Sequence, residues 1–141
     1  MNVYADTSFF VSLYLDDQHS VTAERWMKTQ PGVWLTPLHV AEWTHAIEQH
    51  VFRGRLSASE SRPLHDLFLK DVASGVWAEA ALPESVYGLC GDLARRYGAR
   101  FGARTLDSLH VASALELKAI DFWTFDERQQ KLAKAAGLKV R

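Results

Sequence analysis

Short apolar runs alternate with amphipathic stretches along the chain, and this alternation predicts strands separated by helices. The runs are rich in β-branched and aromatic residues and lie at 2–5, 33–36, 76–80 and 122–125, with a last candidate at 138–140. Helical spacing of apolar residues fills the segments between them, at 7–15, 20–29, 37–52, 57–73, 83–97, 105–118 and 126–137. Strands joined through helices imply right-handed crossovers and a mainly parallel sheet covered on both faces, the α/β class.

Capping and breaking residues predict where several of these helices begin and end. Asp6-Thr7-Ser8 is suited to starting the first helix, Pro37 suits a first turn, and Ser57-Ala58-Ser59-Glu60 has the form of a capping box. Gly137 is a typical helix stop, and the segment 98–102, bounded by two glycines, is expected to be an arginine-bearing connection. The strand-helix order therefore has local signals at most of its boundaries.

The length and charge of the chain limit its partners. The 141 residues have room for one ordinary domain, expected at 1–141, with 48% hydrophobic residues to build its core. A formal net charge of −1 provides no global attraction for nucleic acid or anionic membrane, so a polyanion would have to be bound by a local group of cations.

Cysteine and hydropathy give expectations about the compartment. The single Cys90 excludes an internal disulfide and a Cys-rich zinc site, and it suits a reducing cytoplasm. The apolar stretch 9–15 is far shorter than the roughly 20 residues of a membrane span, and no basic segment precedes it as in a signal peptide. A cytoplasmic protein is expected.

Three acidic residues follow predicted strands. Asp6 closes the first strand, Asp126 closes the fourth, and Glu42 lies in the opening turns of the helix after the second. In open parallel sheets, ligands bind beyond the carboxyl ends of the strands. These three carboxylates are therefore expected to share one rim of the sheet.

Asp107 is the fourth candidate, because its helix is apolar nearly all round and should bury it. A buried carboxylate without a partner is costly. A cation shared by several acids would remove that cost, and Mg²⁺ and Mn²⁺ prefer hard oxygen ligands. Helix capping is the competing explanation for Asp6, Asp107 and Asp126, each of which lies near a predicted helix start. Glu42 falls opposite the apolar face of its helix, so periodicity alone predicts a solvated side chain.

With these residues in order, the chain resembles the PIN-domain family, and within it the single-domain toxins of VapC-like toxin–antitoxin pairs. The resemblance spans the chain, and the segments that carry it are Asp6-Thr7-Ser8, Pro37-Leu38 followed by Glu42, the helix from Leu106 to Ala114, and Thr124-Phe125-Asp126 followed by Gly137-Leu138. It implies a three-layer α/β/α fold, a divalent-metal pocket formed by the four acids, and ribonuclease activity. It also implies a cognate antitoxin and a homodimer.

Under this resemblance the acids receive specific roles. We expect Asp6, Asp107 and Asp126 to bind Mg²⁺ or Mn²⁺ directly or through water, and Glu42 to act as a further ligand or as the base that orients the attacking water. Ser8 and Thr124 match the family's accompanying hydroxyls. One metal ion or two would both be compatible with this set.

RNA contact is expected from cations outside the acidic pocket. Arg95, Arg96, Arg100 and Arg104 crowd the segment that leads to Asp107. Arg104 and Arg100 are the candidate RNA-binding residues, with Arg104 preferred, whereas Arg95 and Arg96 are better explained as part of a solvated helix face.

Three other functions compete with this one. His39, Glu42 and His45 share a helical face and suggest zinc or di-iron, although the alternation of strands and helices does not fit a four-helix bundle. A phosphatase or a receiver-type phosphoacceptor would also place an acid after its first strand, but Ser8 stands where a phosphatase needs a second Asp. A catalytically silent interaction protein would use exposed tryptophans, most of which are expected in the core.

Overall fold

A parallel sheet forms the centre of the molecule in the computed structural model, which describes residues 2–29 and 31–141. Its strands stand in the order β3-β2-β1-β4 and all pair in parallel. They are β1 (Asn2–Ala5), β2 (Gly32–Leu35), β3 (Ala78–Glu79) and β4 (Phe122–Trp123). The expected α/β class with a parallel sheet is confirmed.

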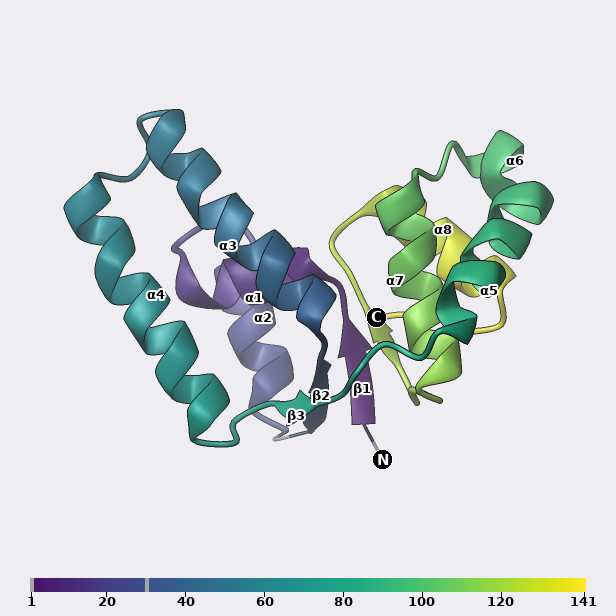
Figure 1. The fold of residues 1–141 in the computed structure, drawn as a ribbon, viewed down its shortest axis with the longest axis horizontal. Helices are drawn as coiled ribbons and strands as arrows, with labels where there is room; N and C mark the ends of the chain where they lie inside the picture. Colours follow the sequence, from purple (N-terminus) through teal and green to yellow (C-terminus); the bar gives the residue numbers. More distant parts are fainter. Residues whose placement is uncertain (1, 30) are drawn as a thin grey trace.

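Helices cover both faces of the sheet, which gives the expected three layers (Figure 1). One face carries α1 (Thr7–Tyr14), α2 (Ser20–Met27), α3 (Pro37–Phe52) and α4 (Ala58–Ala73); the other carries α5 (Ser85–Leu93), α7 (Thr105–Glu116) and α8 (Glu127–Ala135). Successive residues of β1 alternate between the two cores: Val3 and Ala5 pack in the first and Tyr4 in the second. No helix of the described part of the chain has the length and apolarity that a membrane span needs.

Buried aromatic residues fill much of the core on the α1–α4 face. Trp43, Trp77 and Trp123 are buried, as expected for most of the tryptophans. Trp43 stacks on Phe68 at a ring distance of 4.1 Å, which joins α3 to α4. This packing holds the α3–α4 pair as one arm of the molecule.

The predicted helix starts agree closely with the structure. Asp6 accepts a hydrogen bond from the Phe9 N–H at the start of α1, and Asp126 caps α8 by accepting from the Gln129 N–H. The capping box formed by Ser57 and Glu60 is present at the start of α4.

Four segments differ from the expectation, two of them only in length, since the strands expected at 76–80 and 122–125 shorten to Ala78–Glu79 and Phe122–Trp123. The arginine-bearing connection at 98–102 was wrong: after α5 the chain continues through a π-helical turn, Ala94–Gly98, and α6, Ala99–Phe101. Gly98 keeps a right-handed helical backbone, with φ −58°, and the helix ends at Gly102, whose φ of 65° is accessible to glycine. The expected strand at 138–140 reduces to one bridge between Val140 and Phe122.

His39 ties α3 to the end of β1. Its Nε2 donates to the Ala5 carbonyl at 2.7 Å, and its Nδ1 accepts from the Thr36 N–H at 2.9 Å. The ring is fully buried, and burial lowers the pKa of His39 to about 3. A neutral imidazole therefore fixes the start of α3 beside the strand end that carries Asp6.

The variant His39→Gln should lose about 1–3 kcal/mol of unfolding free energy at pH 7, because two buried backbone groups lose a well-placed partner. A histidine whose pKa is lowered by folding stabilises the protein above its unfolded pKa of about 6.5, and this contribution disappears as the pH falls towards the folded value. The deficit of His39→Gln should therefore shrink between pH 7 and pH 4 in urea unfolding. The control is His45→Gln on the exposed part of α3; equal pH dependence of the two variants would contradict the assignment.

Candidate active site

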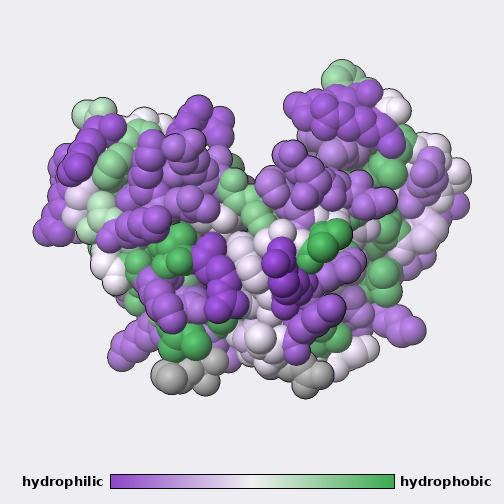
Figure 2. Space-filling view, turned by 180° about the vertical axis from the view of Figure 1, so that it is seen from behind, coloured by the Kyte–Doolittle hydropathy of each residue, from purple (hydrophilic) through white to green (hydrophobic). Residues whose placement is uncertain are grey.

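A hollow of about 460 Å³ lies at the carboxyl edge of the sheet, and all four candidate acids line it. Asp6 comes from the end of β1, Glu42 from the second turn of α3, Asp107 from the first turn of α7, and Asp126 from the N-cap of α8. A notch separates the molecule into two lobes, seen from behind in Figure 2. Glu42 and Asp107 line the hollow from α3 and α7, which lie on opposite sides of the sheet (Figure 1).

Asp6 is the most deeply held of these acids, with 2% of its surface exposed. Its Oδ1 accepts from the Ser8 hydroxyl at 2.5 Å and from the Phe9 N–H at 3.3 Å, and its Oδ2 accepts from the Thr124 hydroxyl at 2.6 Å. The Thr124 hydroxyl in turn accepts from the Asp126 N–H. Burial raises the pKa of Asp6 above its ordinary value, although the electrostatic interaction with His110 and the hydrogen bonds from the Ser8 and Thr124 hydroxyls act in the opposite direction.

Asp107 is buried, as its apolar helix predicts. Its Oδ2 accepts from the Arg104 N–H at 2.9 Å, and its Oδ1 accepts from the side-chain amide of Gln129 at 3.3 Å. The Gln129 N–H donates to Asp126 Oδ1, so Gln129 bridges two of the acids. Asp6, Asp107 and Asp126 each accept a backbone N–H at the start of a helix, as the capping interpretation predicts. The same three side chains also line the hollow.

Glu42 is half-buried, which contradicts the solvated side chain that periodicity alone predicts. The buried face of α3 is formed by His39, Trp43 and Ile47, and Glu42 lies at its margin. Its Oε1 accepts from the Thr7 hydroxyl at 2.8 Å and lies 2.5 Å from His110 Nε2. Burial raises the pKa of Glu42, but the hydrogen bond and electrostatic interaction with His110 and the hydrogen bond from the Thr7 hydroxyl outweigh it, so the net pKa lies below its ordinary value.

The candidate arginines differ in whether they line the hollow. Arg104 lines the hollow, its side chain is 75% exposed, and its Nε lies 3.8 Å from Asp107 Oδ2. Arg100 is not among the lining residues, and its guanidinium lies over the Phe101 ring at 5.0 Å. Arg95 pairs with Asp92 on an exposed face, as a solvated position predicts.

The side-chain oxygen atoms of the hollow fit a divalent cation that keeps some of its waters better than a cation bound by protein atoms alone. Within residues 2–29 and 31–141, no three His, Cys, Asp or Glu side chains converge closely enough to hold one ion as they lie. The hollow nevertheless gathers four carboxylates against a single guanidinium, and oxygen ligands together with retained waters are what Mg²⁺ prefers. Gln129 Oε1 is buried beside them and has no hydrogen-bond partner among the residues that the structure describes, so a metal-bound water could satisfy it.

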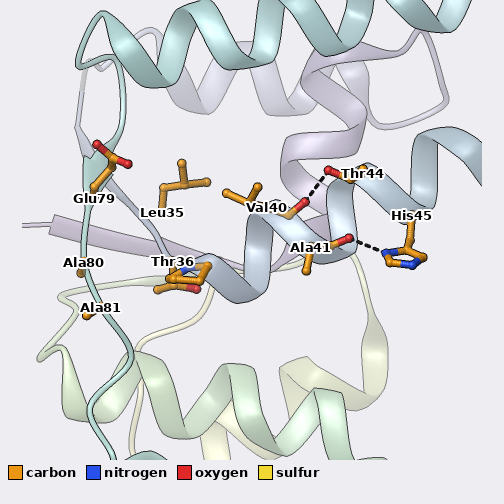
Figure 3. A pocket seen from close by; sticks show the side chains of 10 residues that line it. Leu35, Thr36, Val40, Ala41, Thr44, His45, Glu79, Ala80 and Ala81 are labelled. Carbon is orange, nitrogen blue, oxygen red and sulfur yellow. Dashed lines mark hydrogen bonds between the residues drawn. The ribbon is translucent and has the colours of Figure 1, made fainter.

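A second, larger hollow of about 720 Å³ is mostly apolar and lies between α3 and the segment after β3 (Figure 3). Val40 and Ala41 line one side, and Ala80 and Ala81 line the other. Its chemistry offers little to a polar reaction, so the acidic hollow is the candidate active site.

The zinc or di-iron alternative has no geometric support in the described part of the chain. His39 is directed to the Ala5 carbonyl, and His45 hydrogen-bonds the Ala41 carbonyl at 2.8 Å (Figure 3). These histidines are thus engaged by the backbone rather than by a common centre with Glu42.

His110, Gln129 and Thr7 are residues of the hollow that the sequence interpretation did not select. His110 belongs to the segment of α7 from Leu106 to Ala114, and its position three residues after Asp107 puts both on one helix face. Gln129 has the same spacing from Asp126. No pattern in the sequence connects either residue to its distant partners.

The family follows from comparison with known domains. The model of the PIN domain matches residues 3–135. The chain belongs to the PIN-domain family. None of the curated proteins matches the sequence significantly.

Solved structures of PIN-type proteins share the fold. VapC20 of Mycobacterium tuberculosis, described as a sarcin-ricin loop cleaving toxin, has a TM-score of 0.72 and 18% identity, over 97% of this chain and 96% of that one. FitAcB of Neisseria gonorrhoeae has a TM-score of 0.74 and 17% identity, over 98% and 95%. VapBC2 of Rickettsia felis, solved on a promoter DNA fragment, has a TM-score of 0.69 and 13% identity, over 100% and 98%. At such identities the likeness shows the PIN fold.

The variant Asp6→Asn should raise the unfolding free energy at pH 7 in the presence of EDTA. A carboxyl group whose pKa is raised by folding stabilises the protein below its unfolded pKa of about 3.9, and the contribution is lost as the pH rises through the folded value. Asparagine keeps the shape without the buried charge, so its advantage should shrink as the pH is lowered towards 4. Urea unfolding at both pH values measures this. Asp66→Asn, at an exposed site on α4, is the control; a loss of stability for Asp6→Asn at pH 7 would mean that hydrogen bonds outweigh the charge.

Proposed function

We propose that this PIN-domain protein is a divalent-metal-dependent endoribonuclease and acts as the toxin of a toxin–antitoxin pair. The observation that carries the proposal is the gathering of four carboxylates in one hollow at the carboxyl edge of the sheet. The structural likeness to VapC20, a toxin described as cleaving the sarcin-ricin loop, supports RNA as the substrate. The proposed enzyme is a single domain at 1–141 that works in the cytoplasm.

Asp6, Asp107 and Asp126 would hold Mg²⁺ or Mn²⁺, directly or through its waters. A divalent cation bound there supplies a water of lowered pKa and stabilises the charge that develops on the phosphate. Ser8 and Thr124 keep Asp6 in place by hydrogen bonds to its two oxygens.

The role left open for Glu42 depends on its unengaged oxygen. Its Oε1 is engaged by the Thr7 hydroxyl and by His110 Nε2, whereas Oε2 accepts no hydrogen bond from a residue in 2–29 or 31–141. Glu42 is proposed as a further ligand of the cation, or as the base that orients the attacking water, through this oxygen.

Arg104 is proposed as the contact to an RNA phosphate beside the scissile bond. It is the Lys or Arg residue among the side chains that line the hollow, and its guanidinium is largely exposed. Arg100 is the proposed contact to another phosphate further along the RNA strand. Because the net charge of the chain is −1, such local cations would have to provide the attraction for RNA.

A cognate antitoxin and a second copy of the chain are the proposed protein partners. The likeness to FitAB solved on DNA, with a TM-score of 0.74, supports an antitoxin partner. The apolar hollow between α3 and the segment after β3 would give a partner a surface to cover (Figure 3).

Cation binding should stabilise the fold, and Asp107→Asn should remove most of that effect. A ligand at about 100 times its Kd adds about 2.7 kcal/mol to the unfolding free energy, which thermal unfolding with and without Mn²⁺ would detect. In the same variant, cleavage of a single-stranded RNA should fall to background. Asp66→Asn should retain both properties. Release of phosphate from a small ester without RNA cleavage would instead indicate a phosphatase, and the absence of any cation-dependent shift in the unmodified protein would count against the site.

The variant Arg104→Ala should raise the KM for RNA while leaving folding intact, since the hydrogen bond to Asp107 comes from the backbone N–H and survives in alanine. Losing one phosphate contact should lower the slope of log affinity against log salt by about 1. Arg62→Ala, at an exposed position of α4, should change neither quantity. Unchanged RNA affinity and salt slope in Arg104→Ala would exclude the proposed contact.

A further inference from the structure

His110 is a buried histidine with side-chain partners at both ring nitrogens. It lies on α7, and 2% of its surface is exposed. Its Nε2 is 2.5 Å from Glu42 Oε1, and its Nδ1 is 2.8 Å from the Tyr4 hydroxyl. The ring therefore links Tyr4 of β1 to Glu42 of α3 through its two nitrogens, although α7 itself lies across the hollow from α3.

The chemistry of the partners decides which nitrogen carries the proton. A carboxylate only accepts hydrogen bonds, so Nε2 must carry a hydrogen towards Glu42. In the neutral ring Nδ1 is then the acceptor, and the Tyr4 hydroxyl is its donor. Tyr4 is fully buried, and burial raises the pKa of its hydroxyl, which keeps that donor available.

The same contact leaves the two oxygens of Glu42 in different situations. Oε1 accepts from the Thr7 hydroxyl as well as facing His110 Nε2. For Oε2, the structure records no hydrogen bond from any residue in 2–29 or 31–141. A glutamate side chain otherwise loses up to about 2 kcal/mol of rotamer entropy when it is fixed, so two donors on one oxygen are an effective way to order it.

We propose that His110 is a positioning residue for Glu42: with Thr7 it holds Oε1, so that Glu42 presents Oε2 alone to the hollow, and Tyr4 selects the ring tautomer that makes this possible. The consequence for RNA cleavage rests on the proposed function, whereas the hydrogen-bond arrangement stands independently of it. The two parts can therefore be tested separately.

The first test is long-range ¹⁵N NMR of the imidazole rings in the unmodified protein at pH 8, which reports the ring nitrogen that carries a proton. His110 should carry its proton on Nε2, and Tyr4→Phe should weaken this preference. A proton on Nδ1 in the unmodified protein would overturn the proposal. This readout needs neither a metal ion nor RNA.

The second test compares His110→Leu with His110→Gln. Leucine keeps most of the volume without a donor, and glutamine retains an N–H that can reach Glu42. His110→Leu should lower kcat for Mn²⁺-dependent RNA cleavage by about 10- to 100-fold with little change in KM, as loss of a group that orients a metal-site carboxylate does. His110→Gln should recover part of the rate. Thermal unfolding of both variants identifies any loss of folding.

A double-mutant cycle decides whether His110 acts through Glu42. In a Glu42→Ala background, His110→Leu should cause no further loss of kcat, because the group that it positions is absent. An equal loss in both backgrounds would overturn the proposal. If the unmodified protein cleaves no RNA, the proposed function fails, and the NMR result alone decides the arrangement of His110.

Discussion

Buried negative charge is the constraint on which the rest of this structure depends. Asp6 and Asp107 are 2% and 5% exposed, yet their partners are mostly neutral hydroxyl, amide and backbone N–H groups. The guanidinium of Arg104 is 75% exposed and 3.8 Å away from Asp107, so solvent screens most of its attraction. The acids are thus held in place by hydrogen bonds while their charge stays largely uncompensated, which is the condition under which a cation adds most.

The N-termini of three helices compensate part of this buried negative charge. The helices α1, α7 and α8 all begin at the hollow, and the positive ends of their dipoles favour carboxylates there. Asp6 and Asp126 each satisfy a backbone N–H of their own helix while they line the hollow. Capping and site formation are therefore one arrangement, because a parallel sheet directs its strand ends and the following helix starts to the same edge.

This overlap explains how much the sequence could predict. Asp6 and Asp126 could be selected because a strand, an acid and a helix start follow one another locally. Glu42 could not be placed from periodicity, since its burial comes from α7 across the hollow rather than from its own helix. His110 and Gln129 depend on partners 68 and 22 residues away, which no local pattern reveals. The π-helical turn before α6 was missed for the related reason that Gly98 permits a break without requiring one.

The freedom of each carboxylate indicates how the hollow would adapt to an ion. Asp6 and Asp107 are engaged at both oxygens, so neither can turn without breaking a hydrogen bond. Glu42 and Asp126 are each held at one oxygen by the described residues. Since no three acids converge directly in the described part of the chain, the unengaged oxygens of Glu42 and Asp126 are the ones that could meet a cation without a hydrogen bond being broken. Asp6 and Asp107 would then contact the cation through bound water, which suits Mg²⁺ because this ion loses its hydration waters reluctantly.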